Sequence, residues 1–432
     1  MKLSSFALGA TLCSAAVFAE PVIDASTFKV KQDTSRNVVV TYTLNNDPAI
    51  VTLQAFTNGV ALPGTCVRTL AGDVCKPVEP GARRLYWNAR KDLPDIRLQN
   101  GELSVKLTAW SLSTPPPYMV IDLSKANTRF YYADVDALPY GHPTNTVAYK
   151  RDYLVMRRIP AAGVRWRQGS PDNESGRLTD GREDTRYVTL TQDYYMGIFE
   201  VTEGQVATVL NRYWIVGHTD ANAGDPQTLL SYNNFRGAWD DGAGFGWPEK
   251  GHAAGGVIAQ FRERTGLRGL DLPTAAQWEY ACRAGEGGAL NVPGAVVGDV
   301  AWYNGNSDGH PHPVGQKLPN AWGLYDMLGN VEEYMLDVFF VDWPYVRNFD
   351  LNGEYVDPIG QSSGSKYGSN RVTKGGYWGR PDYLTRNAFV TSQEDWKDES
   401  HGRDGPAFGF RLVCPIDPTA KGVPLIDADN NY

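Results

Sequence analysis

Alternating apolar and polar positions mark the chain from residue 20 to about residue 113 as β-structure. Two runs alternate clearly, Asn37–Leu44 and Glu102–Trp110, and Ile50–Phe56 is a third strand candidate. Turn signals at Asn45–Pro48 and Gln99–Gly101 separate these runs. Short strands with such turns predict a small antiparallel all-β sandwich over residues 20–113. No cluster of catalytic residue types lies in it, which favours a spacer or adhesion module.

The consecutive prolines of Ser113–Pro117 predict a stiff, extended connection. We assign residues 114–150 to this Pro-rich linker and to lead-in strands at Tyr118–Leu123 and Arg129–Val135. From residue 151 to residue 414, glycine and tryptophan are spread through long irregular stretches. This distribution of residues predicts a loop-rich α+β domain over residues 151–414. Residues 415–432 follow this domain as a C-terminal tail.

Three helices are predicted in the second domain. They span Thr202–Trp214, Ala253–Thr265 and Pro273–Cys282. The first and third open with a capping box, in which a threonine precedes a glutamine by three residues. Elsewhere buried aromatic residues, side-chain hydrogen bonds or a bound ion must satisfy the irregular backbone.

The first nineteen residues have the pattern of a secretory signal peptide. Lys2 precedes the uncharged run Leu3–Phe18, and Val17-Phe18-Ala19 is an acceptable cleavage site. A membrane anchor is the alternative, but the run is short for a hydrocarbon layer of about 30 Å. No later stretch approaches 18 apolar residues, so we expect no integral membrane segment. The mature protein is predicted to be exported, to a periplasm, a cell surface or the medium.

The net charge limits the classes of partner, and the cysteine content bears on the redox state of the compartment in which the protein folds. The net charge of −8 argues against nucleic acid, because phosphate binding needs a basic face. Signal cleavage would leave four cysteines, Cys66, Cys75, Cys282 and Cys414. In an oxidising compartment they predict two disulfides, and the short loop between Cys66 and Cys75 favours a local pair that leaves Cys282 for Cys414. Free buried thiols are the alternative.

Five blocks of the second domain, in this order and spacing, resemble the formylglycine-generating enzyme family, also called sulfatase-modifying factor domains. The blocks are Tyr195–Thr202, Leu272–Gly285, Asn320–Tyr334, Arg371–Trp378 and Gly409–Val413. The resemblance implies a compact, loop-rich fold related to the C-type lectins. Catalytic members oxidise a sulfatase cysteine to formylglycine with oxygen, and two cysteines after a Gly-Gly-Ser motif bind their copper. Family members often carry a bridge near the positions of Cys282 and Cys414, which supports that pairing.

The copper chemistry of the family is not expected here. Aligned from Gly376, Tyr377 replaces the usual serine, and Arg380 and Thr385 stand where the two catalytic cysteines would fall. Copper(I) prefers soft thiolates, whereas a guanidinium offers no lone pair and a hydroxyl is a poor soft-metal ligand. We therefore predict a chain without bound copper and without formylglycine-generating activity.

The block around Gly329 implies a structural calcium site. By position in the family, its ligands are the side chains of Asp326 and Glu333 and the backbone carbonyls of Gly329 and Val331. Calcium takes six to eight oxygens, so waters or other groups would complete the shell. The alternative is that these acidic residues form a solvated face. Glu332 replaces a usual tryptophan, which we interpret as a surface substitution.

The favoured function is an exported, non-catalytic recognition protein that binds a glycan, peptide or protein. The candidate groove consists of Tyr377, Trp378, Arg380, Asp382, Thr385, Trp396 and Arg403. Aromatic faces beside Arg and Asp suit such ligands, although these aromatics could simply be core. Two alternatives stay open. One is an enzyme of altered chemistry using Asp382 or His401, and the other is a structural component of a surface assembly.

Overall fold

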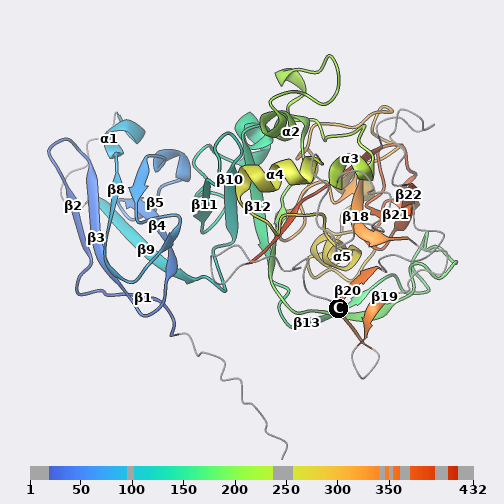
Figure 1. The fold of residues 1–432 in the computed structure, drawn as a ribbon, viewed down its shortest axis with the longest axis horizontal. Helices are drawn as coiled ribbons and strands as arrows, with labels where there is room; N and C mark the ends of the chain where they lie inside the picture. The colour runs from blue at the N-terminus through green and yellow to red at the C-terminus, as the bar shows by residue number, and fades with distance from the viewer. Residues whose placement is uncertain are drawn as a thin grey trace, which may run out of the picture.

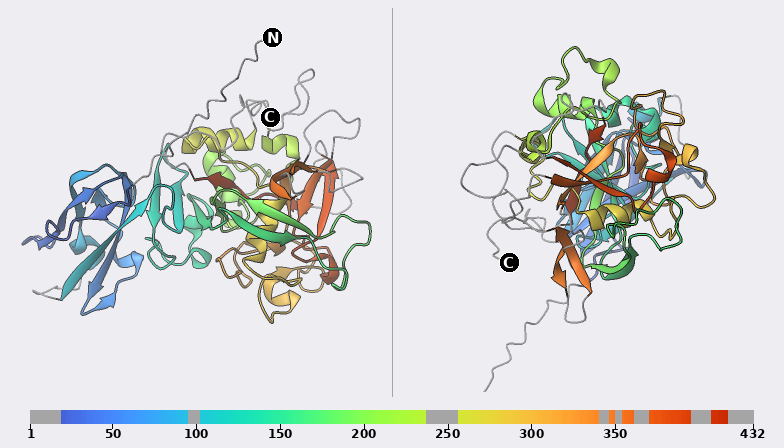
Figure 2. Two further views of the ribbon diagram at one scale, coloured as in Figure 1. Left: turned by 90° about the horizontal axis from the view of Figure 1, so that it is seen from below. Right: turned by 90° about the vertical axis from the view of Figure 1, so that its right-hand side faces the viewer.

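The computed structural model describes residues 19–94, 102–236, 256–339, 346–349, 354–360, 370–394 and 407–416. The N-terminal unit lies at one end of the molecule, and the remainder forms the larger body (Figures 1 and 2). The predicted signal peptide spans residues 1–19, and all of it except Ala19 lies outside the described residues. No helix in the described ranges combines the length and the apolar character needed to cross a bilayer.

Two antiparallel sheets make up the N-terminal unit. One contains β1 (Val22–Ile23), β2 (Lys29–Gln32), β3 (Val38–Asn45), β6 (Leu70–Gly72) and β8 (Gly81–Trp87). The other contains β4 (Ala49–Thr57), β5 (Val60–Ala61), β7 (Pro77–Val78) and β9 (Leu103–Ser111). The short helix α1 (Ala89–Asp92) follows β8. The three predicted strands are therefore confirmed: β3 and β9 are each shifted by one residue, and β4 is one residue longer at each end.

Alternation along β3 explains the core of this unit. Val38, Val40 and Tyr42 are buried, while the residues between them are partly exposed. They pack with Trp87 of β8 and with Val51 and Ala55 of β4, so residues of both sheets share one apolar cluster. Burial of one face of each sheet is the expected result of a period-2 pattern.

The strands expected as a lead-in belong to a sheet at the centre of the larger body. Its order is β11 (Arg129–Tyr132), β10 (Tyr118–Asp122), β12 (Tyr153–Ile159), β15 (Tyr194–Gly197) and β24 (Val413–Pro415). Alternate residues face two different cores: Val120 lies in one apolar cluster, and Met119 and Ile121 lie in the other. A sheet covered on both faces is apolar throughout, which hides its period-2 pattern in the sequence.

The prolines before β10 are packed against this sheet. Pro115 and Pro116 are buried, and the Pro116 carbonyl accepts a hydrogen bond of 2.6 Å from the Tyr195 hydroxyl. The Pro117 carbonyl accepts from the Arg158 backbone N–H at 2.8 Å. The prolines therefore tie the N-terminal unit to the larger body.

Three smaller sheets complete the larger body. The first has the order β13 (Val164–Gln168), β14 (Arg186–Leu190), β20 (Tyr355–Gly360) and β19 (Val346–Phe349). The second has the order β22 (Val390–Glu394), β21 (Asn370–Lys374), β18 (Glu332–Val338) and β23 (Phe408–Gly409). The third is the pair β16 (Ala301–Trp302) and β17 (Leu328–Gly329). The helices are α2 (Glu203–Leu210), α3 (Tyr232–Arg236), α4 (Val257–Thr265), α5 (Ala275–Arg283) and α6 (Val297–Val300). Helix α5 packs against strands of two sheets, β13 and β20 of one and β18 and β21 of the other.

The capping boxes form as predicted. In α2 the Thr202 hydroxyl accepts from the Gln205 N–H, and the same arrangement at Thr274 and Gln277 opens α5. Helix α2 ends at Leu210, earlier than predicted, because Asn211 adopts a left-handed φ of 55°. Helix α4 ends at Thr265 as predicted, and residues 253–255 of that prediction lie outside the described residues.

Neither predicted disulfide is present. None of the four described cysteines is in a disulfide; Cys75, Cys282 and Cys414 are buried and Cys66 is partly exposed. Cys282 on α5 and Cys414 on β24 belong to different apolar clusters, so tertiary structure separates the thiols that sequence reasoning paired. The Cys282 thiol instead donates a hydrogen bond of 3.2 Å to Asn387.

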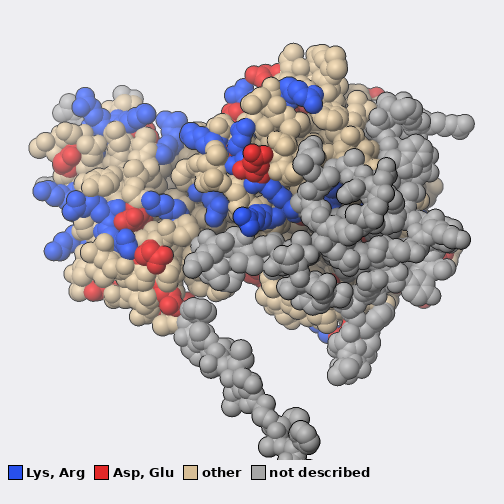
Figure 3. Space-filling model, viewed as in Figure 1, with Lys and Arg blue, Asp and Glu red and all other residues tan. Residues whose placement is uncertain are grey.

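Charge is unevenly distributed over the surface. In the view of Figure 3, Lys and Arg side chains outnumber Asp and Glu over the N-terminal unit and the strands beside it. The chain as a whole carries a net charge of −8. A local basic region on an acidic protein attracts anions at close range.

Candidate functional site

The candidate site forms where β21 runs into two glycines. Gly375 and Gly376 have φ values of 92° and 72°. A Cβ on Gly376 would lie 2.9 Å from the Leu384 carbonyl oxygen and 3.5 Å from the Thr385 hydroxyl. Glycine is therefore required both by the backbone conformation and by this close approach. The loop that begins at Tyr377 therefore returns to its starting point, because Leu384 and Thr385 lie against Gly376.

Arg380 forms an ion pair with Glu332 at the centre of this loop. Nη2 and Nε of Arg380 lie 3.3 and 3.4 Å from Oε2 of Glu332. The Thr373 hydroxyl donates to the other carboxylate oxygen. The Glu332 side chain is fully buried, whereas 29% of the Arg380 side chain is exposed. The pair thus has a buried carboxylate and a guanidinium that reaches the surface.

Aromatic rings and backbone bonds hold Arg380 in place. Its guanidinium carbon lies 5.0 Å from the ring centroid of Tyr377 and 5.8 Å from that of Phe389, within cation–π range. The Arg380 N–H donates to the Tyr377 carbonyl at 2.8 Å, and the Arg380 carbonyl accepts from the Asn304 N–H at 3.0 Å. The position of the guanidinium is therefore defined from several sides.

The predicted groove residues do not all line a surface. Trp378 and Arg380 are partly exposed and Asp382 is exposed, while Tyr377 is buried against Trp378 and Phe408. Thr385 is fully buried, and its hydroxyl donates to the Pro381 carbonyl at 3.2 Å. Trp396 and Arg403, like His401, lie outside the described residues. Of the predicted groove residues that the structure describes, Trp378, Arg380 and Asp382 are the ones accessible at the surface.

Glu332 was missed by sequence reasoning. We interpreted it as a surface substitution, and that interpretation is wrong, because its side chain is fully buried beside Arg380. The sequence carried a signal for this contact: the resemblance predicts that positions 332 and 380 both depart from the family pattern, and the two residues there carry opposite charges. Spatial contact between them could not be derived from their separation along the chain.

A second cluster of charges is buried close to the Gly329 turn. Arg411, fully buried, places Nη2 2.8 Å and Nε 3.0 Å from Oε1 of Glu333. The Trp278 indole N–H donates to Oε2 of Glu333 at 2.7 Å. Arg411 also donates to the Gly197 and Tyr325 carbonyls at 2.9 and 2.8 Å. These bonds connect β15, β18 and the turn before β17.

Two more carboxylates share this cluster. Oδ2 of Asp326 accepts from the Gly315 N–H at 2.6 Å, and Oε2 of Glu200 accepts from the Asn330 amide at 2.7 Å. Burial raises the pKa of Asp326 to about 6, against the effects of the Gly315 bond and of Arg411. Burial and the charges of Asp326 and Glu333 raise the pKa of Glu200 well above its usual value. Carboxylates outnumber cationic side chains in this cluster, so their combined negative charge favours a further positive charge placed among them.

The donor set predicted for calcium is of the right chemical type. Asp326 and Glu333 are buried in one cluster, and the carbonyls of Gly329 and Val331 lie in the segment between them. Hard oxygen donors of this kind suit calcium. Oxygens of Glu333 already accept bonds from Arg411 and Trp278, so calcium would share them. Among the described residues, no group of three or more His, Cys, Asp or Glu is placed to hold a metal.

Comparison with known proteins places these features in a family. Residues 158–416 match the model of the sulfatase-modifying factor enzyme 1-like domain. The formylglycine-generating enzyme of Mus musculus is 31% identical over 168 residues, which cover 35% of this chain and 41% of the mouse protein. That of Streptomyces coelicolor is 30% identical over 167 residues, covering 35% of this chain and 49% of the relative. The matched segment thus spans about half or less of these relatives.

Among solved structures, PvdO from Pseudomonas aeruginosa is 24% identical, with a TM-score of 0.46, covering 61% of this chain and 94% of PvdO. Treponema denticola variable protein 1 is 23% identical, with a TM-score of 0.42, covering 61% of this chain and 95% of that protein. The family match covers more than half of the chain and includes the Gly376 turn, Arg380 and Arg411. The chain therefore belongs to the family of sulfatase-modifying factor enzyme 1-like domains.

Proposed function

We propose that this protein is an exported, non-catalytic recognition protein in which an ion pair replaces the copper site of the family. The observation that carries the proposal is the contact between Arg380 and Glu332. Arg380 stands where the resemblance places the first copper-binding cysteine, and Thr385 where it places the second. A guanidinium cannot ligate a metal, and the Thr385 hydroxyl is buried and bonded to Pro381.

The exposed side of Arg380 supports binding of an anionic ligand. Its Nη1 makes no hydrogen bond with the described residues, while Nε and Nη2 face Glu332. Trp378, two residues earlier in the same loop, is partly exposed. A guanidinium beside an aromatic face binds carboxylate or sulfate groups of glycans and peptides by charge-assisted hydrogen bonds. We therefore propose a ligand with an acidic group.

The Arg380 site can be tested on arrays of acidic glycans and peptides. For ligands that the wild-type mature protein binds, Arg380→Ala should weaken binding by about tenfold or more, because a charge-assisted bond is lost. Trp378→Ala should also weaken it. Arg84→Ala, which removes an exposed arginine of β8 in the N-terminal unit, is the matched control and should leave binding unchanged. Unchanged binding in both site variants would remove the groove from the proposal.

Copper provides an independent test of the same proposal. Purified protein loaded with copper(I) should lose the metal to a moderate chelator and should not convert a sulfatase-type cysteine peptide. Tightly held copper(I) at this loop, together with oxygen consumption, would overturn the proposal.

We further propose roles for the remaining parts. Residues 1–19 direct export, and the N-terminal unit acts as a β-sandwich that provides reach or attachment. The domain after it has a C-type-lectin-related fold. Calcium, held by Asp326, Glu333 and the carbonyls of Gly329 and Val331, would order the surrounding loops and would take no part in catalysis.

The calcium proposal predicts a stability effect. Removing calcium with EGTA should lower the melting temperature by several degrees, because a structural ion binds the folded state only. Asp326→Asn, which keeps an oxygen donor, should reduce the shift, and elemental analysis should find one calcium per chain. An unchanged melting temperature with no calcium detected would exclude the site.

A further inference from the structure

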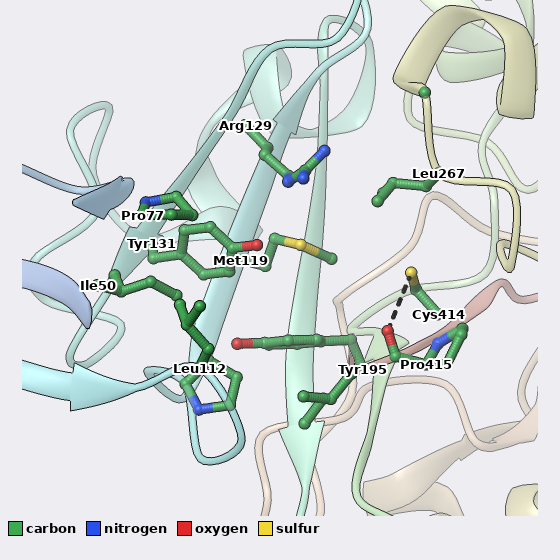
Figure 4. Close-up of a pocket in the computed structure, with 13 residues that line it drawn as sticks. Ile50, Pro77, Leu112, Met119, Arg129, Tyr131, Tyr195, Leu267, Cys414 and Pro415 are labelled. Atoms are coloured by element: carbon green, nitrogen blue, oxygen red, sulfur yellow. Dashed lines mark hydrogen bonds between the residues drawn. The ribbon is translucent and has the colours of Figure 1, made fainter. Parts of the chain in front are cut away.

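A cavity of about 280 Å³ lies between the N-terminal unit and the central sheet of the larger body. Its residues come from β4, β7, β10, β11, β15 and β24, from the turn after α4, and from the segment that leads from β9 into the Pro-rich connection. None of its residues belongs to the loop around Arg380. Figure 4 shows side chains from both parts of the protein directed into one space.

The floor of the cavity is apolar and well ordered by packing. Ile50, Met119 and Tyr195 are each only 2% exposed, and Cys414 is 3% exposed. Met119 lies beside Tyr131 in the β10–β11 ladder, and Tyr195 lies beside Cys414 in the β15–β24 ladder. The Tyr195 hydroxyl is already bonded to Pro116. An apolar body is therefore the part of a ligand that this floor accommodates.

Among the described residues that line this cavity, Arg129 is the one that carries a charge. Its side chain makes no hydrogen bond, ion pair or ring contact with other described residues, and the residue is only partly exposed. Figure 4 shows its guanidinium extending across the space in the direction of Leu267. A cation at the side of an apolar floor, without a carboxylate partner in the described ranges, is complementary to an amphiphilic anion.

We propose that this cavity binds a medium-chain fatty acid, with its alkyl chain over Met119 and Tyr195 and its carboxylate at Arg129. The volume of about 280 Å³ lies just below the usual range of ligand pockets, which favours a small ligand. A carboxylic acid of about ten non-hydrogen atoms, such as octanoate, suits that size. Since residues of the N-terminal unit and the central sheet both contact it, the ligand would bridge the two parts of the protein.

Calorimetric titration of the full mature protein with octanoate tests this proposal. Octanoate should bind at one site, and 1-octanol, which has the same chain without the charge, should bind about tenfold or more weakly. Arg129→Gln should weaken the binding of octanoate by the same factor and should leave the affinity for 1-octanol unchanged. Arg84→Gln, an equal change of charge on the exposed face of β8, should change neither affinity.

The thiol of Cys414 gives a second readout at the same place. Octanoate should slow alkylation of Cys414 by a maleimide, measured by mass spectrometry of its peptide, and leave alkylation of Cys66 unchanged. Leu267→Trp, at the side of the cavity, should reduce both the protection and the affinity. No binding of octanoate, equal binding of octanol, or binding without protection of Cys414 would each overturn the proposal.

Discussion

Replacing Arg411 by methionine should lower the free energy of unfolding by about 3–5 kcal/mol. The reason is the burial of its partners: Glu333 is 1% exposed, and Glu200 and Asp326 are similarly buried. Without the guanidinium, these carboxylates lose the cation whose charge acts on all three. The carbonyls of Gly197 and Tyr325 would also lose their donors. Urea unfolding in EGTA, followed by tryptophan fluorescence, measures the effect.

The matched control for Arg411 is Arg165, which pairs with Glu354 at the surface. The two side chains are 48% and 31% exposed. Arg165→Met should cost less than about 1 kcal/mol, because water and salt screen an exposed pair. Adding Glu333→Gln to Arg411→Met should recover part of the loss by removing the unpaired charge. A loss below 1 kcal/mol in Arg411→Met would show that the guanidinium does not stabilise the cluster.

Replacing Glu279 on α5 by glutamine should also cost about 3 kcal/mol at neutral pH and should change the response to acid. Oε2 of Glu279 lies 3.0 Å from Nζ of Lys374, and Oε1 lies 2.9 Å from Nη2 of Arg283. The Gly169 N–H donates to Oε1 at 2.8 Å. Burial would raise the pKa of Glu279, but Lys374, Arg283 and the Gly169 bond together lower it to about 2. A pKa near 2, against 4.5 unfolded, corresponds to about 3 kcal/mol.

The direction of the acid effect follows from that lowered pKa. The stabilisation is fully present above pH 4.5 and is lost as the pH falls towards 2, because the unfolded chain then binds a proton that the folded chain resists. Melting temperatures measured from pH 7 to pH 2 should therefore fall less steeply for Glu279→Gln than for the wild type. Glu354→Gln, at the exposed pair, should follow the wild-type curve. Parallel curves for Glu279→Gln and the wild type would contradict the assignment.

Local patterns account for the elements that were predicted correctly. Alternation placed β3 and β9, because residues on one face of each strand are more buried than those on the other face. Strand β4 lacks this pattern, since its first four residues are all buried. The Thr–Gln spacing placed the starts of α2 and α5, since a capping box involves only residues three apart. The irregular segments have no such short-range rule. Their backbone is satisfied by distant side chains, as when Arg411 donates to Gly197.

The sequence by itself determined the family and the strands of the N-terminal unit, and it predicts that Arg380 and Thr385 stand where the family carries its copper-binding cysteines. Only the tertiary structure decided that Glu332 is buried against Arg380, that Cys282 and Cys414 lie in separate cores, and that Arg129 faces an apolar cavity. The physical reason is the distance along the chain over which each interaction acts. Propensity, alternation and capping act between neighbours along the chain, whereas ion pairs, thiol contacts and cavities depend on which distant segments pack together.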